Sequence, residues 1–116
     1  MNKETIFQSA IETLLWSECD DDGNPLDKNY EVEDISEETC DKLRKDCDNF
    51  VEANKVMLKE SGLSDELIGH NFVLSRNGHG AGFFDAGCPH ADELQRATKP
   101  YGTFGFYIGD DEKLYG

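Results

Sequence analysis

Three side chains beside a glycine-rich segment have the types that acid–base chemistry on an anionic ligand needs. The segment FVLSRNGHGAGFFD, residues 72–85, carries Arg76, His79 and Asp85. An arginine can hold an anion with its fork of N–H donors, a histidine can act as a general base, and a carboxylate can orient that histidine. Glycines let a ligand approach the backbone closely. These three residues are therefore one candidate ligand or catalytic site.

The same segment matches no phosphate-binding motif. RNGHGAG is not followed by the Lys-Ser or Lys-Thr of a Walker loop, and no helix is expected to open after it, as the dinucleotide fingerprint requires. The structural alternative is that Gly78, Gly80 and Gly82 serve turn and bulge geometry while Arg76 pairs with a surface acid. Both interpretations stay open, and we expect no cofactor.

Acidic residues dominate the composition and gather in one part of the chain. The sequence has 25 Asp plus Glu against 11 Lys plus Arg, a formal charge of −14. Residues 18–48 alone hold thirteen acids and four bases. Such a field repels nucleic-acid phosphates and anionic membranes, so we expect the chain to bind neither directly. A basic protein is the partner that this charge attracts.

The acids of this stretch are the candidate partner-binding residues. Duplex DNA carries about one charge per 1.7 Å of axis, and a helix with acids every three or four residues beside an acidic loop roughly matches that density. The candidates are Asp20, Asp21, Asp22, Glu31, Glu33, Glu37, Glu38, Asp41 and Asp48. They predict a surface that imitates DNA. The alternative is that the charge only keeps a small protein soluble.

The spacing of possible ligands predicts no metal site. An EF-hand loop that begins at Glu18 would have Asn29 at its twelfth position, where calcium needs a bidentate Glu. Among the histidines and cysteines, Cys88 and His90 form a close pair with no matching second pair, unlike a structural zinc site. The four cysteines, with no charged-then-apolar leader before them, indicate a reducing cytoplasm.

Apolar residues at three- and four-residue steps predict two N-terminal helices, over residues 3–16 and 35–60. Asp34 and Glu37 have the spacing of a capping box at the start of the second helix, and Gly62 is expected to end it. The intervening stretch is a long acidic loop. Loops of more than about 12 residues are often functional, so this loop is the first place to look for a partner site.

The rest of the chain predicts a small sheet. Asn77-Gly78 between two apolar runs is typical of a two-residue hairpin turn. The expected elements are a helical turn at 64–68, strands at 71–76, 81–85, 103–108 and 114–115, and a helix at 89–99. The predicted fold is α+β: two N-terminal helices packed on a small, mainly antiparallel sheet of three to four strands, with a third helix between strands. One domain spans residues 1–116.

Several phrases together resemble a known group of proteins. They are LLWSECDDDGNPLDKNY at 14–30, DIS at 34–36, DCDNF at 46–50, GHNFVLSRNGHGAGFFD at 69–85 and YIGDDEKLYG at 107–116. In this order they resemble a family of small, acidic, largely uncharacterised bacteriophage proteins that share the RNGHGAGF-x-D phrase. The resemblance implies an accessory protein in the cytoplasm of an infected bacterium, and it transfers no catalytic residue.

Charge and resemblance together favour a non-enzymatic inhibitor. Its expected target is a basic host defence protein that normally binds nucleic acid, such as a restriction or CRISPR component. Two alternatives stay open: a small enzyme or ligand-binding domain around Arg76, His79 and Asp85, and a minor virion component. No apolar stretch approaches the roughly 20 residues of a membrane span.

Overall fold

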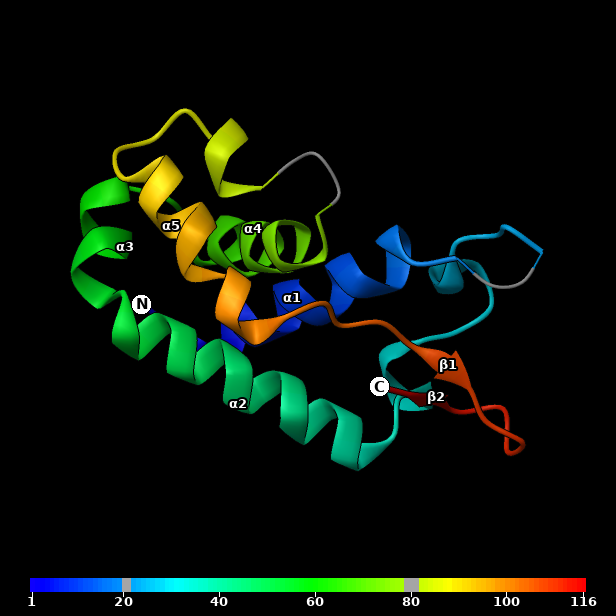
Figure 1. Ribbon diagram of the computed structural model, residues 1–116. Helices are drawn as coiled ribbons and strands as arrows, with labels where there is room; N and C mark the ends of the chain where they lie inside the picture. Colours follow the sequence, from blue (N-terminus) through cyan, green and yellow to red (C-terminus); the bar gives the residue numbers. More distant parts are fainter. Residues whose placement is uncertain (20–21, 79–81) are drawn as a thin grey trace.

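Helices make up most of the chain in the computed structural model, which describes residues 1–19, 22–78 and 82–116 (Figure 1). The α-helices are α1 (Lys3–Ser17), α2 (Glu37–Ala53), α3 (Lys55–Ser61), α4 (Asp65–Asn77) and α5 (Ala91–Ala97). Single 3-10 turns are η1 (Leu26–Lys28), η2 (Val32–Asp34), η3 (Phe83–Asp85) and η4 (Lys99–Tyr101). The strands of the described chain are β1 (Tyr107–Ile108) and β2 (Leu114–Tyr115). None of the helices in these ranges has the length and apolar character that a bilayer crossing demands.

The predicted α+β fold is wrong, because the described residues form helices and a single two-stranded antiparallel sheet. The expected hairpin accounts for most of the error. Residues 71–76 form the second half of α4, and Gly78 ends that helix in the left-handed conformation at φ 69°. A glycine with positive φ ends a helix as readily as it makes a tight turn. Of the second expected strand, Phe83–Asp85 is a 3-10 turn and Ala81 lies outside the described residues.

The helix α4 forms because its signals agree over its whole length. The Ser64 side chain accepts a hydrogen bond from the Leu67 N–H, and acids occupy the first turn. Ile68, Phe72 and Val73 then recur at helical spacing and are buried. The single turn expected at 64–68 is therefore the start of a longer helix.

The two predicted N-terminal helices are present, with one break. The helix expected over 3–16 is confirmed as α1. The helix expected over 35–60 is interrupted at Asn54, whose side-chain amide donates to the Phe50 carbonyl at 2.9 Å and competes with the helical hydrogen bonds. Its N-cap is Ser36 instead of Asp34, and Gly62 ends α3 at φ 72°, as expected.

The third expected helix and the later strands are shorter than predicted. Within the expected helix over 89–99, α5 covers only Ala91–Ala97. Of the strand expected over 103–108, only Tyr107–Ile108 pairs, with Tyr107 opposite Tyr115 and Ile108 opposite Leu114. The expected strand at 114–115 is confirmed as β2.

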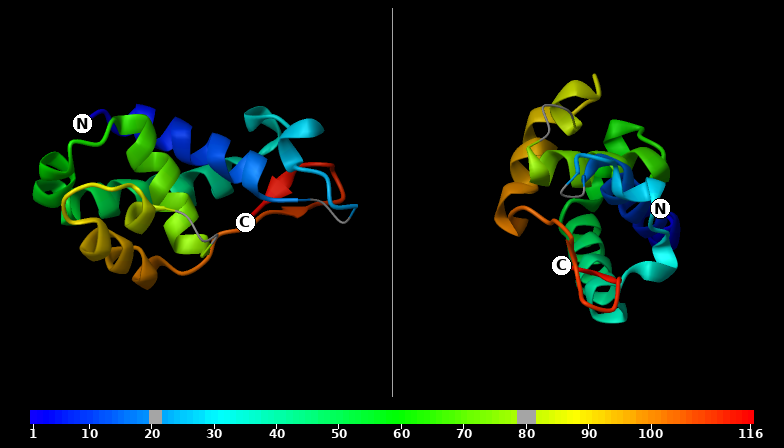
Figure 2. Two further views of the ribbon diagram at one scale, coloured as in Figure 1. Left: turned by 90° about the horizontal axis from the view of Figure 1, so that it is seen from above. Right: turned by 90° about the vertical axis from the view of Figure 1, so that its right-hand side faces the viewer.

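The core forms where α1 crosses α4 and where α2 carries its apolar face toward both (Figure 2). Phe50 stacks on Phe72 with ring centroids 4.6 Å apart, and on Phe83 at 5.6 Å. The backbones of α1 and α4 approach closely at Gly69, where an added Cβ would lie 2.2 Å from the Ile6 carbonyl oxygen. Only glycine fits this crossing.

We predict that Gly69→Ala destabilises the protein by about 2 kcal/mol. Helix propensity alone would favour alanine by about 1 kcal/mol, but the added methyl group would overlap a backbone carbonyl that cannot rotate away. Urea unfolding followed by circular dichroism measures the difference. The matched control is Gly105→Ala, where the nearest atom to a new Cβ is a flexible Glu18 oxygen at 3.5 Å. A Gly69→Ala protein as stable as wild type would contradict the close approach.

Candidate functional site

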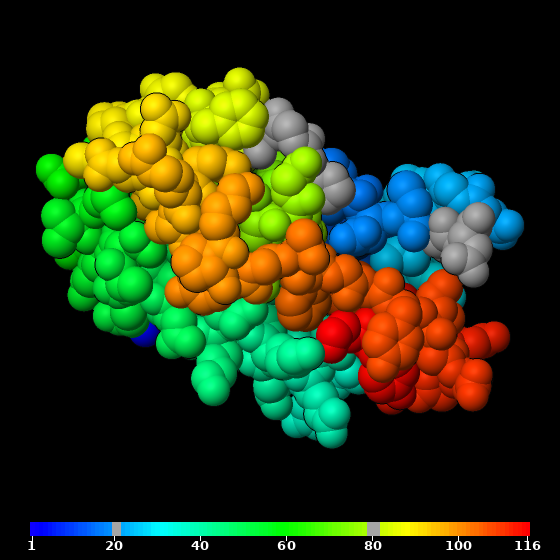
Figure 3. Space-filling model, in the orientation of Figure 1, coloured from blue at the N-terminus to red at the C-terminus, as the bar shows by residue number. Residues whose placement is uncertain are grey.

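Two acidic segments meet at one end of the elongated molecule, which measures 43 × 25 × 22 Å (Figures 2 and 3). We define the acidic end as residues 27–42 and 110–113. Hydrogen bonds join the first segment to the residues that directly follow the second: the Ser36 N–H donates to the Leu114 carbonyl at 2.9 Å, and the Gly116 N–H donates to the Thr39 hydroxyl at 3.0 Å. Segments that are distant in sequence therefore present one surface.

The acidic end carries half of the formal charge of the chain. It holds ten carboxylates and three lysines, a formal charge of −7 out of −14. None of these carboxylates forms an ion pair within the described ranges of the chain. The acids that do pair belong to other regions: Glu52 with Lys3, Glu4 with Arg44, Asp46 with Arg76, and Glu60 and Glu93 with His90. The charge of this end is thus largely unneutralised.

The structure brings together five of the nine predicted partner-binding acids. Glu31, Glu33, Glu37, Glu38 and Asp41 are exposed within the acidic end. Asp22 is exposed in the preceding loop, and Asp20 and Asp21 lie outside the described residues. Asp48 lies farther along α2, where its charge acts on Lys3 and Arg44. Asp48 therefore belongs to the neutralised part of α2.

Sequence reasoning missed the second segment of this surface, which carries three of its ten carboxylates. Asp110, Asp111 and Glu112 are exposed in the turn between β1 and β2, beside residues 29–34. The Tyr115 hydroxyl donates to Asp111 Oδ2 at 2.7 Å, and this bond lowers the pKa of the Asp111 carboxyl below its usual value. In the sequence these acids are typical turn formers, and no local pattern places them next to residues that precede them by about 75 positions.

An apolar patch adjoins the acids on the same strand pair. Tyr107 is 64% exposed, Ile108 is 43% exposed, and the Tyr107 ring stacks on Tyr115 with centroids 5.6 Å apart. Large aromatic side chains that stay exposed to solvent are common anchors of protein interfaces. The acidic end therefore combines charge with a nearby apolar contact surface.

The structure places Arg76 in the interior, with 2% of its side chain exposed. Its Nε donates to the Gly102 carbonyl at 2.8 Å, one terminal nitrogen donates to the Tyr101 carbonyl at 2.8 Å, and the other pairs with Asp46 Oδ2 at 3.0 Å. The guanidinium also lies 5.2 Å from the centre of the Phe72 ring. Through these contacts, Arg76 attaches the chain that follows α5 to α4 and α2.

The neighbours of Arg76 hold other segments in the same way. The Ser75 hydroxyl accepts from the Phe83 N–H at 3.0 Å. The Asn77 amide donates to the Phe104 carbonyl at 2.8 Å and accepts from the Phe104 N–H at 2.7 Å. Three consecutive side chains at the end of α4 therefore position most of the C-terminal third of the protein.

Among the described residues, the Arg76 network includes no hydrogen bond from the Asp85 side chain. Asp85 is exposed on η3, and His79 lies outside the described residues. The ring of His70 stacks on Trp16 at 5.7 Å, and its Nδ1 lies 3.3 Å from the Thr13 hydroxyl. Within residues 1–19, 22–78 and 82–116, no three His, Cys, Asp or Glu side chains gather in a way that would hold a metal ion.

The most buried thiol is held in its neutral form. Cys47 is 1% exposed, and burial raises the pKa of its thiol from 9.0 to about 12. A neutral thiol is a poor nucleophile. Its packing against the apolar face of α2 makes Cys47 a core residue.

Comparisons of the chain with protein-family models, with curated proteins and with solved structures found no match.

We predict that Arg76→Leu destabilises the protein by about 3 kcal/mol, because it leaves two inward carbonyls and the Asp46 carboxylate without their donor. The change in the midpoint of urea unfolding, at constant slope, measures the loss. Arg96→Leu on the exposed face of α5 is the matched control and should change stability by less than about 0.5 kcal/mol. Equal effects of the two substitutions would show that the Arg76 contacts contribute nothing specific.

We also predict that Cys47 makes the fold sensitive to alkali. Between pH 9 and 12 the folded thiol keeps its proton and the unfolded thiol loses it, so stability falls as pH rises. The free energy of unfolding of wild type should fall faster than that of Cys47→Val, by up to about 1.4 kcal/mol per pH unit. Urea unfolding of both proteins at intervals from pH 7 to about pH 10.5 tests this, since other titrating groups cancel in the difference. Parallel stability curves would contradict it.

Proposed function

We propose that this protein is a non-enzymatic binding protein whose acidic end docks onto a basic, nucleic-acid-binding surface of another protein. The observation that carries the proposal is the gathering of ten carboxylates from residues 27–42 and 110–113, without ion pairs among the described residues. Helix capping accounts for Glu37 and Glu38, which lie in the first turn of α2. It does not account for Glu33 or for the acids of the β1–β2 turn.

The electrostatics favour fast and selective association. A surface of one sign speeds the approach of an oppositely charged partner and slows that of wrong ones. Charge alone gives little affinity, because salt screens exposed groups beyond about 10 Å at 0.1 M ionic strength. The exposed pair Tyr107 and Ile108 supplies apolar contact area next to the acids, as interface anchors do.

We propose more specifically that the acidic end imitates the phosphate backbone of duplex DNA. A protein that binds duplex DNA presents lysines and arginines spaced to meet phosphates, and carboxylates on a helix start, a 3-10 turn and a hairpin turn offer a comparable array. The resemblance to small acidic bacteriophage proteins supports a host defence protein as the target, inside the cytoplasm of an infected bacterium. Restriction and CRISPR components are the class of protein that such an inhibitor would block.

A pull-down with DNA competition tests this function. The wild-type protein, immobilised and exposed to lysate of the infected host, should retain a nucleic-acid-binding protein at about 0.05 M salt and release it at about 0.5 M. Duplex DNA should also release it, since DNA and the acidic end would compete for one surface. Mass spectrometry identifies the retained protein, and its DNA-binding activity is then measured with and without the inhibitor.

Charge-matched variants make the test specific. Reversal of the acidic end by Glu33→Lys, Glu38→Lys and Asp41→Lys should abolish capture. The control Glu60→Lys, Glu66→Lys and Asp92→Lys changes the net charge equally, at exposed positions on α3, α4 and α5, and should leave capture intact. Capture that survives both reversals, or that DNA does not compete, would refute the DNA-mimic function.

A further inference from the structure

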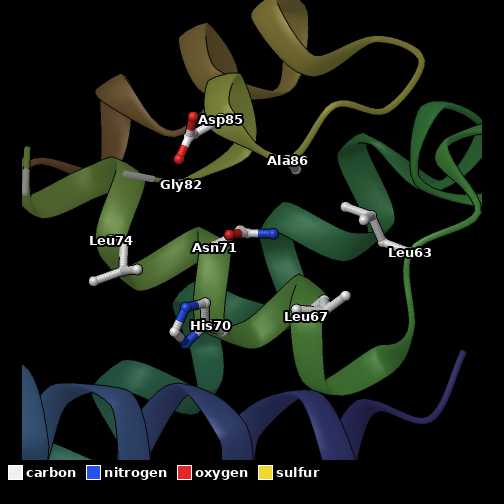
Figure 4. A pocket seen from close by; sticks show the side chains of 8 residues that line it. All are labelled: Leu63, Leu67, His70, Asn71, Leu74, Gly82, Asp85 and Ala86. Atoms are coloured by element: carbon white, nitrogen blue, oxygen red, sulfur yellow. The ribbon is translucent and has the colours of Figure 1, made fainter. Parts of the chain in front are cut away.

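A pocket of about 250 Å³ opens between α4 and the segment that begins with η3, and it shares no residue with the acidic end (Figure 4). Leu63, Leu67 and Leu74 give it apolar walls. Asn71 and Asp85 contribute polar groups, while His70, which also lines the pocket, directs its ring toward α1 (Figure 4). Apolar walls with a few convergent polar groups are typical of small-molecule sites.

Asn71 is the distinctive residue of this pocket. It is 6% exposed, and its carboxamide points into the space between α4 and the segment carrying Gly82 and Ala86 (Figure 4). No described residue forms a hydrogen bond with that carboxamide, in contrast to Asn77, which uses both its donor and its acceptor. Buried polar side chains normally have partners, because an unmade hydrogen bond costs free energy. The amide atoms themselves reach the open space of the pocket, where a bound molecule can form the hydrogen bonds that the described residues leave unmade.

The chemistry of the lining restricts that molecule. A carboxamide pairs best with an edge that carries a donor beside an acceptor, as it does with the N6 and N7 positions of adenine. The volume accommodates on the order of ten non-hydrogen atoms, at about 30 Å³ for each water-sized group. Leucine side chains suit the faces of a flat ring, and the exposed carboxylate of Asp85 disfavours a phosphate at the entrance.

We propose that this pocket binds a small neutral or cationic heteroaromatic molecule of the size of a nucleobase, held by paired hydrogen bonds to Asn71. Leu63, Leu67 and Leu74 contact the ring. Asp85 accepts a hydrogen bond from an amino group of the ligand or faces a positive charge on it. The pocket shares no residue with the acidic end, so the proposed ligand and the proposed protein partner can be tested independently.

Adenine is the probe that tests the site. In a titration followed by ¹⁵N–¹H NMR, adenine should shift the side-chain amide signals of Asn71 and the backbone signals of α4 around it, with a dissociation constant on the order of 1 mM for so small a ligand. Purine, which lacks the amino group, should bind about tenfold more weakly, and so should adenosine monophosphate.

Variants separate binding from folding. Asn71→Leu keeps the volume of the side chain and removes a buried polar group, so the protein should stay folded while its affinity for adenine falls at least tenfold. Asn49→Leu on the exposed face of α2 is the matched control and should bind adenine as wild type does. Three outcomes would overturn the proposal and leave a water-filled pocket. Adenine could shift NMR signals away from Asn71 only, it could shift the same signals in Asn71→Leu, or it could shift none up to its solubility limit.

Discussion

The buried guanidinium of Arg76 is the interaction on which the rest of the structure depends. The chain after α5 contributes a single two-stranded pair and has no ladder of hydrogen bonds to hold it against the helices. Arg76 supplies that attachment by donating to two carbonyls of residues 101–102 while Asp46 of α2 balances its charge. A buried arginine without partners raises the free energy of the folded state. The arrangement in which α2, α4 and residues 101–102 meet around Arg76 is therefore favoured over arrangements that leave it unpaired. Arg76 thereby links α2, α4 and the C-terminal segment, and Asn77 adds a second attachment through the Phe104 backbone.

The acidic end depends on a further contact of the C-terminal segment. The turn that carries Asp110, Asp111 and Glu112 reaches the start of α2 because β2 lies beside Ile35, where Leu114 is fully buried in the core. Like charges repel, so the apolar contact must outweigh the repulsion between the two acidic segments. Carboxylates repel one another at the acidic end, whereas carboxylates elsewhere form ion pairs. This uneven charge distribution is the most distinctive property of the surface.

Local patterns predicted the helices better than the arrangement of the C-terminal half. The periodicity of Ile6, Ala10 and Leu14 predicts a helix, and Gly62 comes at the end of a long helical stripe and so predicts a helix end. Both predictions are confirmed. Asn77-Gly78 has two local meanings, a hairpin turn and a helix end. The choice depends on whether Ile68 and Phe72 find a helix to pack on, which they do in α1 and α2. Similarly, the acids before residue 42 could be predicted as a site, whereas residues 110–112 join them only through tertiary contacts.

The position of Asn77, directly before Gly78, makes deamidation of its side chain structurally important. Asparagine followed by glycine is the pair most prone to spontaneous loss of the side-chain amide, and asparagine is among the residues that heat damages first. Here that amide forms two hydrogen bonds with the Phe104 backbone, so its conversion to a carboxylate would set an anion against the Phe104 carbonyl. Deamidation at this one position would thus weaken the attachment of Phe104 to the end of α4, while the Arg76 contacts to residues 101–102 would remain.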